Sequence, residues 1–150
     1  MELVAEQVEV VPASEKELYS ITVMTKKFFP YTGFNFEEIV KRIGAGTTRY
    51  LVAKQGSRTV GYLDYELLED QAKILGLAVL EECRGQGIGK KLLQKALEEI
   101  AAAGKPRVFI FVAEDNKAAQ DLYLAAGFQH WGTLEKKLND KTVLLMKKEF

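Results

Sequence analysis

The sequence has very little of two residues that build many catalytic and metal sites: one cysteine, Cys83, and one histidine, His130. A single cysteine excludes an intrachain disulfide and a cysteine-rich metal site. A single histidine excludes a multi-histidine zinc site and argues against a Ser-His-Asp triad. We therefore expect no bound metal.

The chain also lacks a charge excess and a long apolar run. Its 21 basic and 21 acidic side chains cancel, whereas a nucleic-acid binder usually carries a basic excess. The longest apolar stretch, Val108–Ala113, is far shorter than the roughly 20 residues that span a bilayer. The first residues include acids and no basic region, so they do not resemble a signal peptide. We expect a soluble cytoplasmic protein that binds neither nucleic acid nor a membrane.

No repeat, low-complexity run or linker divides the 150 residues, and the three prolines all fall at expected element edges. A chain of this length that is 47% hydrophobic suits one domain with a sizeable core. We therefore expect residues 1–150 to form a single domain.

Apolar periodicity and cap residues predict the order of the secondary structure. The expected elements are a strand at Val8–Val11, helices from Ser14 to about Lys27 and from Asn35 to about Ile43, strands at Thr48–Lys54, Thr59–Leu68 and Lys73–Leu80, a helix after the glycine-rich segment 84–89, a strand at Arg107–Val112, a helix from Asn116 to Ala126, and a hairpin of Gln129–Leu138 and Thr142–Lys148 around Asn139-Asp140. The strand–helix–strand unit predicts one parallel pair, and the hairpins predict antiparallel neighbours. Because its apolar residues do not alternate, the strand at 107–112 is expected to be buried on both faces. The fold class is α/β, with a central mixed, mostly antiparallel sheet of about seven strands and helices on both faces.

The most distinctive segment is Arg84-Gly85-Gln86-Gly87-Ile88-Gly89-Lys90-Lys91, between an expected strand and an expected helix. Glycines let backbone N–H groups approach a ligand closely, and a helix N-terminus offers free donors and partial positive charge. Lysines in the first helical turn oppose the helix dipole by roughly 0.3–1 kcal/mol each, a penalty that a bound polyanion would reverse. The segment therefore predicts a phosphate or pyrophosphate site rather than an ordinary strand-to-helix turn.

Two common phosphate-binding motifs do not fit this segment. The Walker motif would need glycine in place of Arg84 and serine or threonine in place of Lys91. The dinucleotide fingerprint needs Gly-x-Gly-x-x-Gly, whereas the glycines here stand at every second position. The pattern that remains is Arg-x-x-Gly-x-Gly, fulfilled by Arg84, Gly87 and Gly89.

That pattern, within LAVLEECRGQGIGKKLL, resembles the acetyl-CoA motif of the GCN5-related N-acetyltransferase (GNAT) family. A second segment, AEDNKAAQDLYLAAGF, resembles the family's next motif: an asparagine (Asn116), a tyrosine seven residues later (Tyr123), and then Gly-Phe. The two motifs occur in the family's order, and the element order extends the resemblance over roughly Val8 to Lys148. The resemblance implies a GNAT-like acyl-CoA acyltransferase fold and an N-acetyltransferase with acetyl-CoA as cosubstrate.

The resemblance implies a role for each matching residue. The pantetheine arm would lie along the backbone of Leu77, Ala78 and Val79, and an N–H from Val79 would polarise the thioester carbonyl. The pyrophosphate would be wrapped by Arg84, Gly85, Gln86, Gly87, Ile88, Gly89 and Lys90. Asn116 would bind the cofactor, cap its own helix, or both. Tyr123 would protonate the leaving thiolate, although its place on an apolar helix face also suits a packed core tyrosine. Cys83 would be a bystander because direct transfer needs no covalent intermediate.

The general base departs from the family pattern. Many relatives carry a glutamate five residues before the asparagine, where this chain has Phe111. We place Glu114 in the site as a catalytic candidate, with Asp64, Glu66 and His130 as alternatives. Alternation puts Asp64 and Glu66 on one strand face with Tyr62, and we interpret that face as an ordinary solvent face.

Five aromatic residues would either form one wall of the acceptor cleft, as the resemblance implies, or pack two short helices together: Phe28, Phe29, Tyr31, Phe34 and Phe36. The acceptor would be an amine on a small molecule or a protein, and one branch of the family, with similar motif segments, acetylates protein N-termini. The sequence leaves a homodimer open. Because Phe111 replaces the usual glutamate, a non-catalytic acyl-CoA-binding sensor stays the alternative function, and another nucleotide-binding protein is a third hypothesis.

Overall fold

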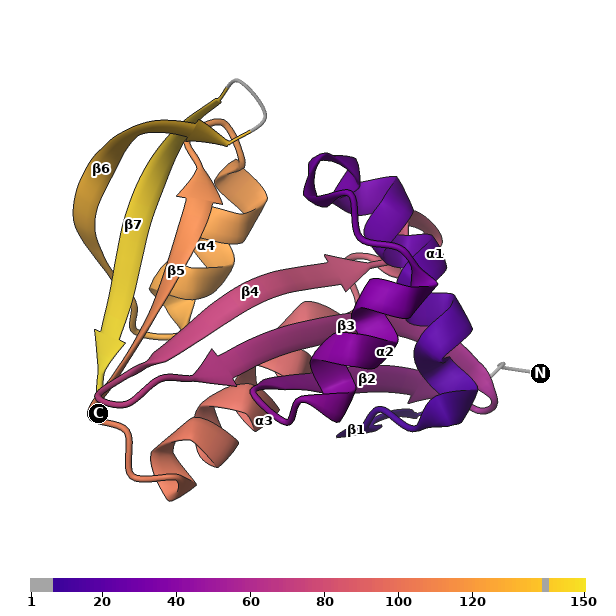
Figure 1. The fold of residues 1–150 in the computed structure, drawn as a ribbon. Helices are drawn as coiled ribbons and strands as arrows, with labels where there is room; N and C mark the ends of the chain where they lie inside the picture. Colours follow the sequence, from indigo (N-terminus) through magenta and orange to yellow (C-terminus); the bar gives the residue numbers. More distant parts are fainter. Residues whose placement is uncertain (1–6, 139–140) are drawn as a thin grey trace.

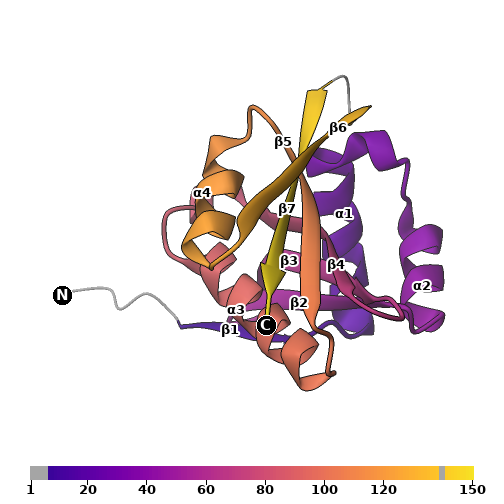
Figure 2. The same ribbon diagram turned by 90° about the vertical axis from the view of Figure 1, so that its left-hand side faces the viewer.

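The computed structural model of the chain describes residues 7–138 and 141–150. Figures 1 and 2 show one twisted sheet with helices on both of its faces. The strands are β1 (Val8–Pro12), β2 (Thr48–Gln55), β3 (Arg58–Leu67), β4 (Ala72–Val79), β5 (Arg107–Ala113), β6 (Gln129–Leu138) and β7 (Lys141–Glu149). The helices are α1 (Leu18–Phe28), α2 (Phe36–Gly44), α3 (Ile88–Ala102) and α4 (Lys117–Ala125), with the short turns η1 (Glu15–Glu17), η2 (Pro30–Thr32) and η3 (Glu81–Cys83). The predicted element order is confirmed, and the expected turn at Asn139-Asp140 lies outside the described residues.

The strands lie in the order β1-β2-β3-β4-β5-β7-β6, which is the mixed, mostly antiparallel sheet that the sequence predicts. Among the described strands, β4 and β5 alone run parallel, and their pairing is short. It joins Ala72 to Val108, Lys73 to Phe109 and Ile74 to Ile110. Beyond that point the two strands separate, as Figure 1 shows, and the sheet divides into two halves that meet at one end.

An irregularity in β4 lies beside this separation. Asp64 of β3 pairs with Gly76, and the next residue, Tyr65, pairs with Ile74, so Leu75 has no partner on β3. An extra residue of this kind bends a strand and changes the direction of the side chains that follow it. The bulge therefore helps β4 to turn away from β5.

Side-chain alternation divides the core into two clusters, one on each face of the sheet. On β2, Leu51 packs with the cluster beneath α3 and α4, whereas Tyr50 packs with the cluster beneath α1 and α2. Figure 2 shows these two helix pairs on opposite sides of the sheet. Most of β1–β4 is thus covered on both faces.

The first helix begins as its cap residues predict, with one difference. The Ser14 backbone N–H and hydroxyl both donate to Oε1 of Glu17, at 3.0 and 2.9 Å. This capping box forms around η1, so α1 itself starts at Leu18. The buried positions of α1 include Ile21 and Thr25.

The expected burial of β5 on both faces is wrong. Val108, Ile110 and Val112 are buried in the cluster beneath α3 and α4, whereas Phe109 and Phe111 on the other face are half-buried. These two rings lie edge to face, 5.7 Å apart, and neither packs with the described residues of the cluster beneath α1 and α2. Because the residues on this half-buried face are aromatic, the sequence of β5 after its first residue is apolar throughout even though one face is not fully buried.

Among the described residues, no helix is both long and apolar enough to cross a bilayer.

Candidate active site

A cavity of about 330 Å³ lies where β4 and β5 separate. Residues of β3 and β4 line one side, residues of β5 and α4 line the other, and α1, η2 and α2 supply a third wall. Sites for small ligands commonly have volumes of about 300–1,000 Å³. Of the residues singled out from the sequence, those that line the cavity are Phe29, Tyr31, Phe34, Asp64, Leu77, Phe111, Asn116 and Tyr123.

The backbone of β4 presents polar groups to this opening, and one of them, the Val79 carbonyl, accepts from Arg84 Nε. The Leu80 N–H donates to the Val60 carbonyl, so Gly61 and Val79 form a non-hydrogen-bonded pair. By the same alternation, the N–H and C=O groups of Leu77 and Val79 point away from β3, toward the side that β5 has left. Those of Ala78 point toward β3 instead. Leu77 and Val79 are therefore the residues whose backbone can receive an extended ligand.

The glycine-rich segment forms the connection between η3 and α3. Gly85 and Gly87 have φ angles of 80° and 78°, a left-handed conformation that glycine adopts without strain. Gly87 is the N-cap of α3 and, lacking a side chain, leaves the N–H groups of Ile88, Gly89 and Lys90 without an intrahelical acceptor. A Cβ at either Gly85 or Gly87 would contact nothing within 4 Å, so the space over the loop is open.

Arg84 fixes this loop to the end of β4. Its Nε donates to the Val79 carbonyl at 3.1 Å, and its guanidinium lies 5.3 Å from the ring centre of Phe28. Gln86 and Lys90 are exposed, and Cys83 is buried in the cluster beneath α3. The structure thus brings Arg84, the three glycines and the start of α3 together around one open surface.

Asn116 caps its helix, which is one of the two roles expected for it. Its side-chain oxygen accepts from the Ala119 N–H at 3.1 Å. The same residue lines the cavity. The cap is therefore confirmed, and a contact with the cofactor stays a prediction.

Tyr123 belongs to both the core and the cavity. It is 2% exposed and packs edge to face on Phe128, with 5.2 Å between ring centres. Burial raises the pKa of its hydroxyl, and the charge of Asp64 raises it further. The hydroxyl is therefore protonated at neutral pH and can donate a proton to a group in the cavity.

Glu114 is not brought to the cavity. It lies just after the end of β5, its side chain is exposed, and its backbone N–H donates to the Thr142 carbonyl at 2.8 Å. His130 on β6 and Glu66 on β3 also lie outside the lining residues. The side chains of Glu114, His130 and Glu66 therefore do not line the cavity, although the hypothesis of a general base among them requires it.

The sequence suggests Asp64 only as an alternative base, and its expected environment differs from the one observed. The prediction that it occupies a solvent face is wrong, since it is 6% exposed and lines the cavity. Alternation assigns it correctly to the face of Tyr62, but α1, η2 and α2 cover that face. Its place in a central strand, between two antiparallel neighbours, was the available sign of burial.

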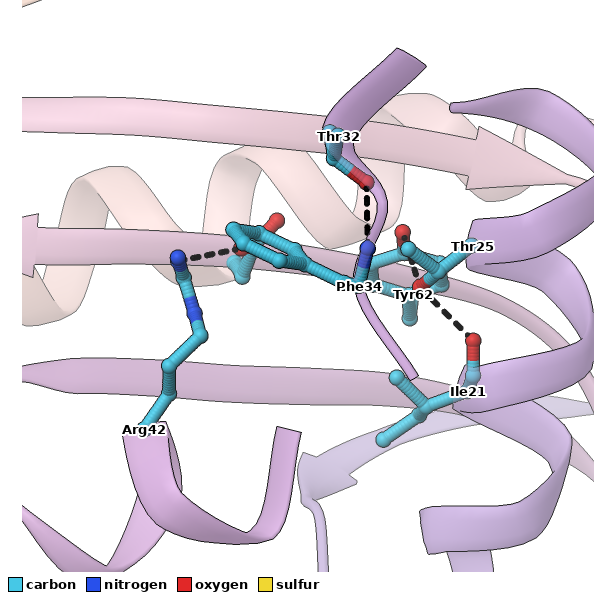
Figure 3. Close-up of polar contacts among 7 residues, drawn as sticks. Ile21, Thr25, Thr32, Phe34, Arg42 and Tyr62 are labelled. Carbon is cyan, nitrogen blue, oxygen red and sulfur yellow. Dashed lines mark hydrogen bonds and ion pairs between the residues drawn. The ribbon is translucent and has the colours of Figure 1, made fainter. Parts of the chain in front are cut away.

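The surroundings of Asp64 are compact and contain one cation. Arg42 of α2 places Nη2 3.4 Å from Oδ2, and its guanidinium lies 4.5 Å from the ring centre of Phe34 (Figure 3). A Cβ on the facing residue, Gly76, would lie only 3.0 Å from Oδ1. Burial raises the pKa of the Asp64 carboxyl to about 7, against the opposing effect of Arg42.

A second polar contact ties the helical wall to the sheet. The Thr25 hydroxyl of α1 lies 2.9 Å from the Tyr62 hydroxyl and donates to the Ile21 carbonyl at 2.8 Å (Figure 3). Tyr62 stands two residues before Asp64 on the same face of β3. The contact therefore holds α1 over the part of the sheet that carries Asp64.

The five aromatic residues from Phe28 to Phe36 are expected either to form a wall of the cavity or to pack α1 and α2 together, and they differ in which they do. Phe29, Tyr31 and Phe34 line the cavity, and Phe29 and Phe34 also pack against the cluster beneath α1. Phe28 packs on that cluster alone, and Phe36 is exposed. The segment is thus both a cavity wall and a support for the helices.

At the position of the usual glutamate, Phe111 lines the cavity beside a cation. Lys73 Nζ lies 4.6 Å from the centre of the Phe111 ring. This part of the cavity therefore carries a positive charge in place of a carboxylate. Within the described part of the chain, no three His, Cys, Asp or Glu side chains are grouped to hold a metal ion.

This architecture and cavity are those of an acyl-CoA acyltransferase fold, and the comparisons agree. Two solved structures share the fold over nearly their whole length: PaiA N-acetyltransferase from Thermoplasma acidophilum in complex with coenzyme A (TM-score 0.83, 18% identity, 96% of this chain and 99% of that one) and ribosomal-protein-alanine N-acetyltransferase from Brucella melitensis (TM-score 0.82, 21% identity, 95% and 99%).

The sequence comparisons identify the family. A Bacillus subtilis protein with the provisional name [ribosomal protein bS18]-alanine N-acetyltransferase is 32% identical over 83 residues, which make up 55% of this chain and 55% of that protein. The family model of the acetyltransferase (GNAT) family matches residues 16–128. The chain belongs to the GNAT acetyltransferase family.

Proposed function

We propose that this chain, acting as one domain over residues 1–150, is an N-acetyltransferase that transfers the acetyl group of acetyl-CoA directly to a primary amine. One observation carries the proposal: the glycine loop, the open edge of β4 and the Tyr123 cavity adjoin one another, since Arg84 of the loop donates to the Val79 carbonyl and Leu77 of β4 lines the cavity with Tyr123. A diphosphate, an extended arm and a thioester occur in this order in acetyl-CoA. The structural neighbour in complex with coenzyme A supports the same cosubstrate for this fold.

The loop and β4 would hold the cofactor. The amides of Gly85 to Gly89 and the N-terminus of α3 suit the diphosphate, and Lys90 adds a positive charge. Along β4, the backbone groups of Leu77 and Val79 suit the amides of the pantetheine arm, with Asn116 across the opening. Ala78 would contribute its small side chain rather than its backbone groups, which point toward β3.

In the reaction, the neutral amine attacks the thioester carbon, and the carbonyl oxygen takes negative charge. The Val79 N–H, which points away from β3, would polarise that oxygen. When the tetrahedral intermediate collapses, the C–S bond breaks and Tyr123 protonates the leaving sulfur. Cys83 takes no part, since it is buried in the cluster beneath α3.

The acceptor is a primary amine on a small molecule or a protein. The similarity to a relative named for alanine acetylation on a ribosomal protein supports testing protein N-termini first. A suitable panel contains alanyl peptides, lysyl peptides, spermidine and simple alkylamines.

The test is release of coenzyme A from acetyl-CoA in the presence of each amine, with parallel calorimetry of coenzyme A binding. Amine-dependent release that is lost in the Tyr123→Phe variant supports the enzyme. Tight binding with no turnover on any amine would instead identify a sensor of acyl-CoA. Absence of binding by well-folded protein would refute both functions.

A further inference from the structure

We propose that the Asp64 carboxylate is the general base of the acyl transfer and takes the proton of the acceptor amine within the cavity. This inference rests on the proposed function and adds the catalytic group that the family's usual position, now Phe111, does not supply.

The cavity holds few side chains that can accept a proton. Among its lining residues in the described part of the chain, Asp64 is the only acid, and no histidine or cysteine accompanies it. The other ionisable lining groups are the cations Arg42 and Lys73 and four tyrosine hydroxyls. Cations cannot accept a proton from an amine, and burial raises the pKa of Tyr50, Tyr62 and Tyr123. Asp64 is therefore the lining side chain that can serve as the base.

Asp64 lies in the middle of β3, facing the helical wall, and shares the cavity with Tyr123 of α4. The missing side chain of Gly76 leaves the space in which the carboxylate sits. An amine between Asp64 and Tyr123 would thus have the proton acceptor on one side and the proton donor for the sulfur on the other.

Charged and titratable groups from several elements surround the carboxylate. Arg42 of α2, Tyr50 of β2 and Glu66 of β3 act on it directly, and Tyr31 of η2, Tyr62 of β3, Lys73 of β4 and Tyr123 of α4 line the same cavity. Burial raises the pKa of Asp64, Glu66 raises it further, and Arg42 and hydrogen bonding to Tyr50 lower it, with a result of about 7. A base is most effective when its pKa lies near the working pH.

The step is balanced as follows. The nitrogen lone pair forms the C–N bond, the proton of the amine passes to an Asp64 oxygen, and the C–S electron pair leaves with the sulfur. Tyr123 donates its proton to that sulfur. Solvent at the cavity mouth then removes the proton from Asp64 and restores the one on Tyr123, so the enzyme returns to its starting state.

The decisive experiment compares pH profiles of kcat/KM for two acceptors of similar size, ethylamine and trifluoroethylamine. The fluorines keep the second amine unprotonated near neutral pH, so its own titration does not contribute. For the wild type with trifluoroethylamine, we expect kcat/KM to fall as the pH drops through about 7, because Asp64 becomes protonated. The Asp64→Asn variant should lose this limb and about 10²–10⁴-fold in rate at neutral pH.

Three controls separate catalysis from structure. Calorimetry with coenzyme A and thermal melting should show that Asp64→Asn still folds and binds the cofactor. Glu66→Gln, on the same face of the same strand but outside the cavity, should keep the wild-type rate and an acidic limb, with the limb moved to lower pH because the Glu66 charge raises the pKa of Asp64. For Asp64→Ala, added formate should restore part of the activity by supplying a carboxylate in the vacated space, which a structural role would not allow.

The outcomes distinguish the two proposals. If the wild type acetylates amines and Asp64→Asn retains its rate and its acidic limb, Asp64 is not the base, and the proposed function stands. If the wild type acetylates neither these amines nor any other in the panel, the proposed function fails and the assignment of Asp64 fails with it.

Discussion

Gly76 and Asp64 face each other across β3 and β4 so closely that a side chain at residue 76 would crowd the carboxylate. A Cβ on Gly76 would lie 3.0 Å from the Asp64 Oδ1 and 3.3 Å from Cε2 of Phe29. The φ angle of Gly76 is not left-handed, so the restriction comes from its neighbours and not from its backbone. The carboxylate and one aromatic wall of the cavity thus depend on the absence of a single side chain.

Replacement of Gly76 by alanine should push the Asp64 carboxylate and the Phe29 ring apart. Overpacking of this kind costs about 1–3 kcal/mol in folding free energy. We expect a lower melting temperature and a lower kcat/KM for the amine, with coenzyme A affinity nearly unchanged because β4 keeps its backbone position. Gly44→Ala is the matched control, since a Cβ there contacts nothing within 4 Å. Equal activity of the Gly76→Ala and Gly44→Ala variants would contradict the expected crowding around Gly76.

Gly87→Asp should weaken coenzyme A binding severely. The new carboxylate would stand at the N-cap of α3, in the open space assigned to the diphosphate, and would repel it. Gly104→Asp is the control, because Gly104 has a similar φ of 79°, an equally open surrounding and a place at the other end of α3. Calorimetry should show a large loss of affinity for the first variant and none for the second.

Tyr123→Phe should lower kcat by about 10²–10⁴-fold, the usual contribution of a positioned acid, and leave the Kd for coenzyme A close to the wild-type value. Tyr65→Phe provides the comparison. Tyr65 is also buried on the α3 side of the sheet, but its hydroxyl donates to Glu99 at 2.6 Å, and it does not line the cavity. The Tyr65→Phe variant should lose stability and keep its turnover. If Tyr123→Phe instead kept its turnover while Tyr65→Phe lost it, Tyr123 would be removed from the mechanism.

Arg42→Gln should move the acidic limb of the pH profile upward. The Arg42 charge lowers the pKa of Asp64, so its removal raises that pKa above about 7. More of the carboxylate is then protonated at neutral pH, and activity should fall at pH 7 and recover at higher pH. Carbon-13 NMR of the Asp64 carboxyl can follow the same shift without substrate. Arg42→Lys, which keeps the charge, should shift the limb less, and an unmoved limb in the glutamine variant would argue against Asp64 as the titrating group.

The sequence predicts the order of the elements and the glycine loop because both are encoded locally. Ser14 with Glu17, Asn116 with its helix, and the glycines at 85 and 87 each act within a few residues of themselves. The choice of Tyr123 comes from the resemblance of its segment to the family's second motif, which is also a local pattern. These features need no knowledge of what packs across the sheet.

The environment of Asp64 could not be predicted in the same way. Alternation assigns Asp64 and Tyr62 to one face of β3, but whether α1 and α2 lie over that face depends on contacts between segments far apart in the chain. The choice of Glu114 followed proximity in sequence to the usual position at Phe111. The end of β5 at Ala113 instead places Glu114 outside the lining of the cavity.

The brief pairing between β4 and β5 has a further consequence for handling the protein. Strand edges with unpaired N–H and C=O groups are templates for association with other chains, and here such edges lie inside the sheet rather than at its border. A cofactor lying along β4 would mask them. Preparations stripped of coenzyme A should therefore precipitate sooner on storage or heating than those saturated with it.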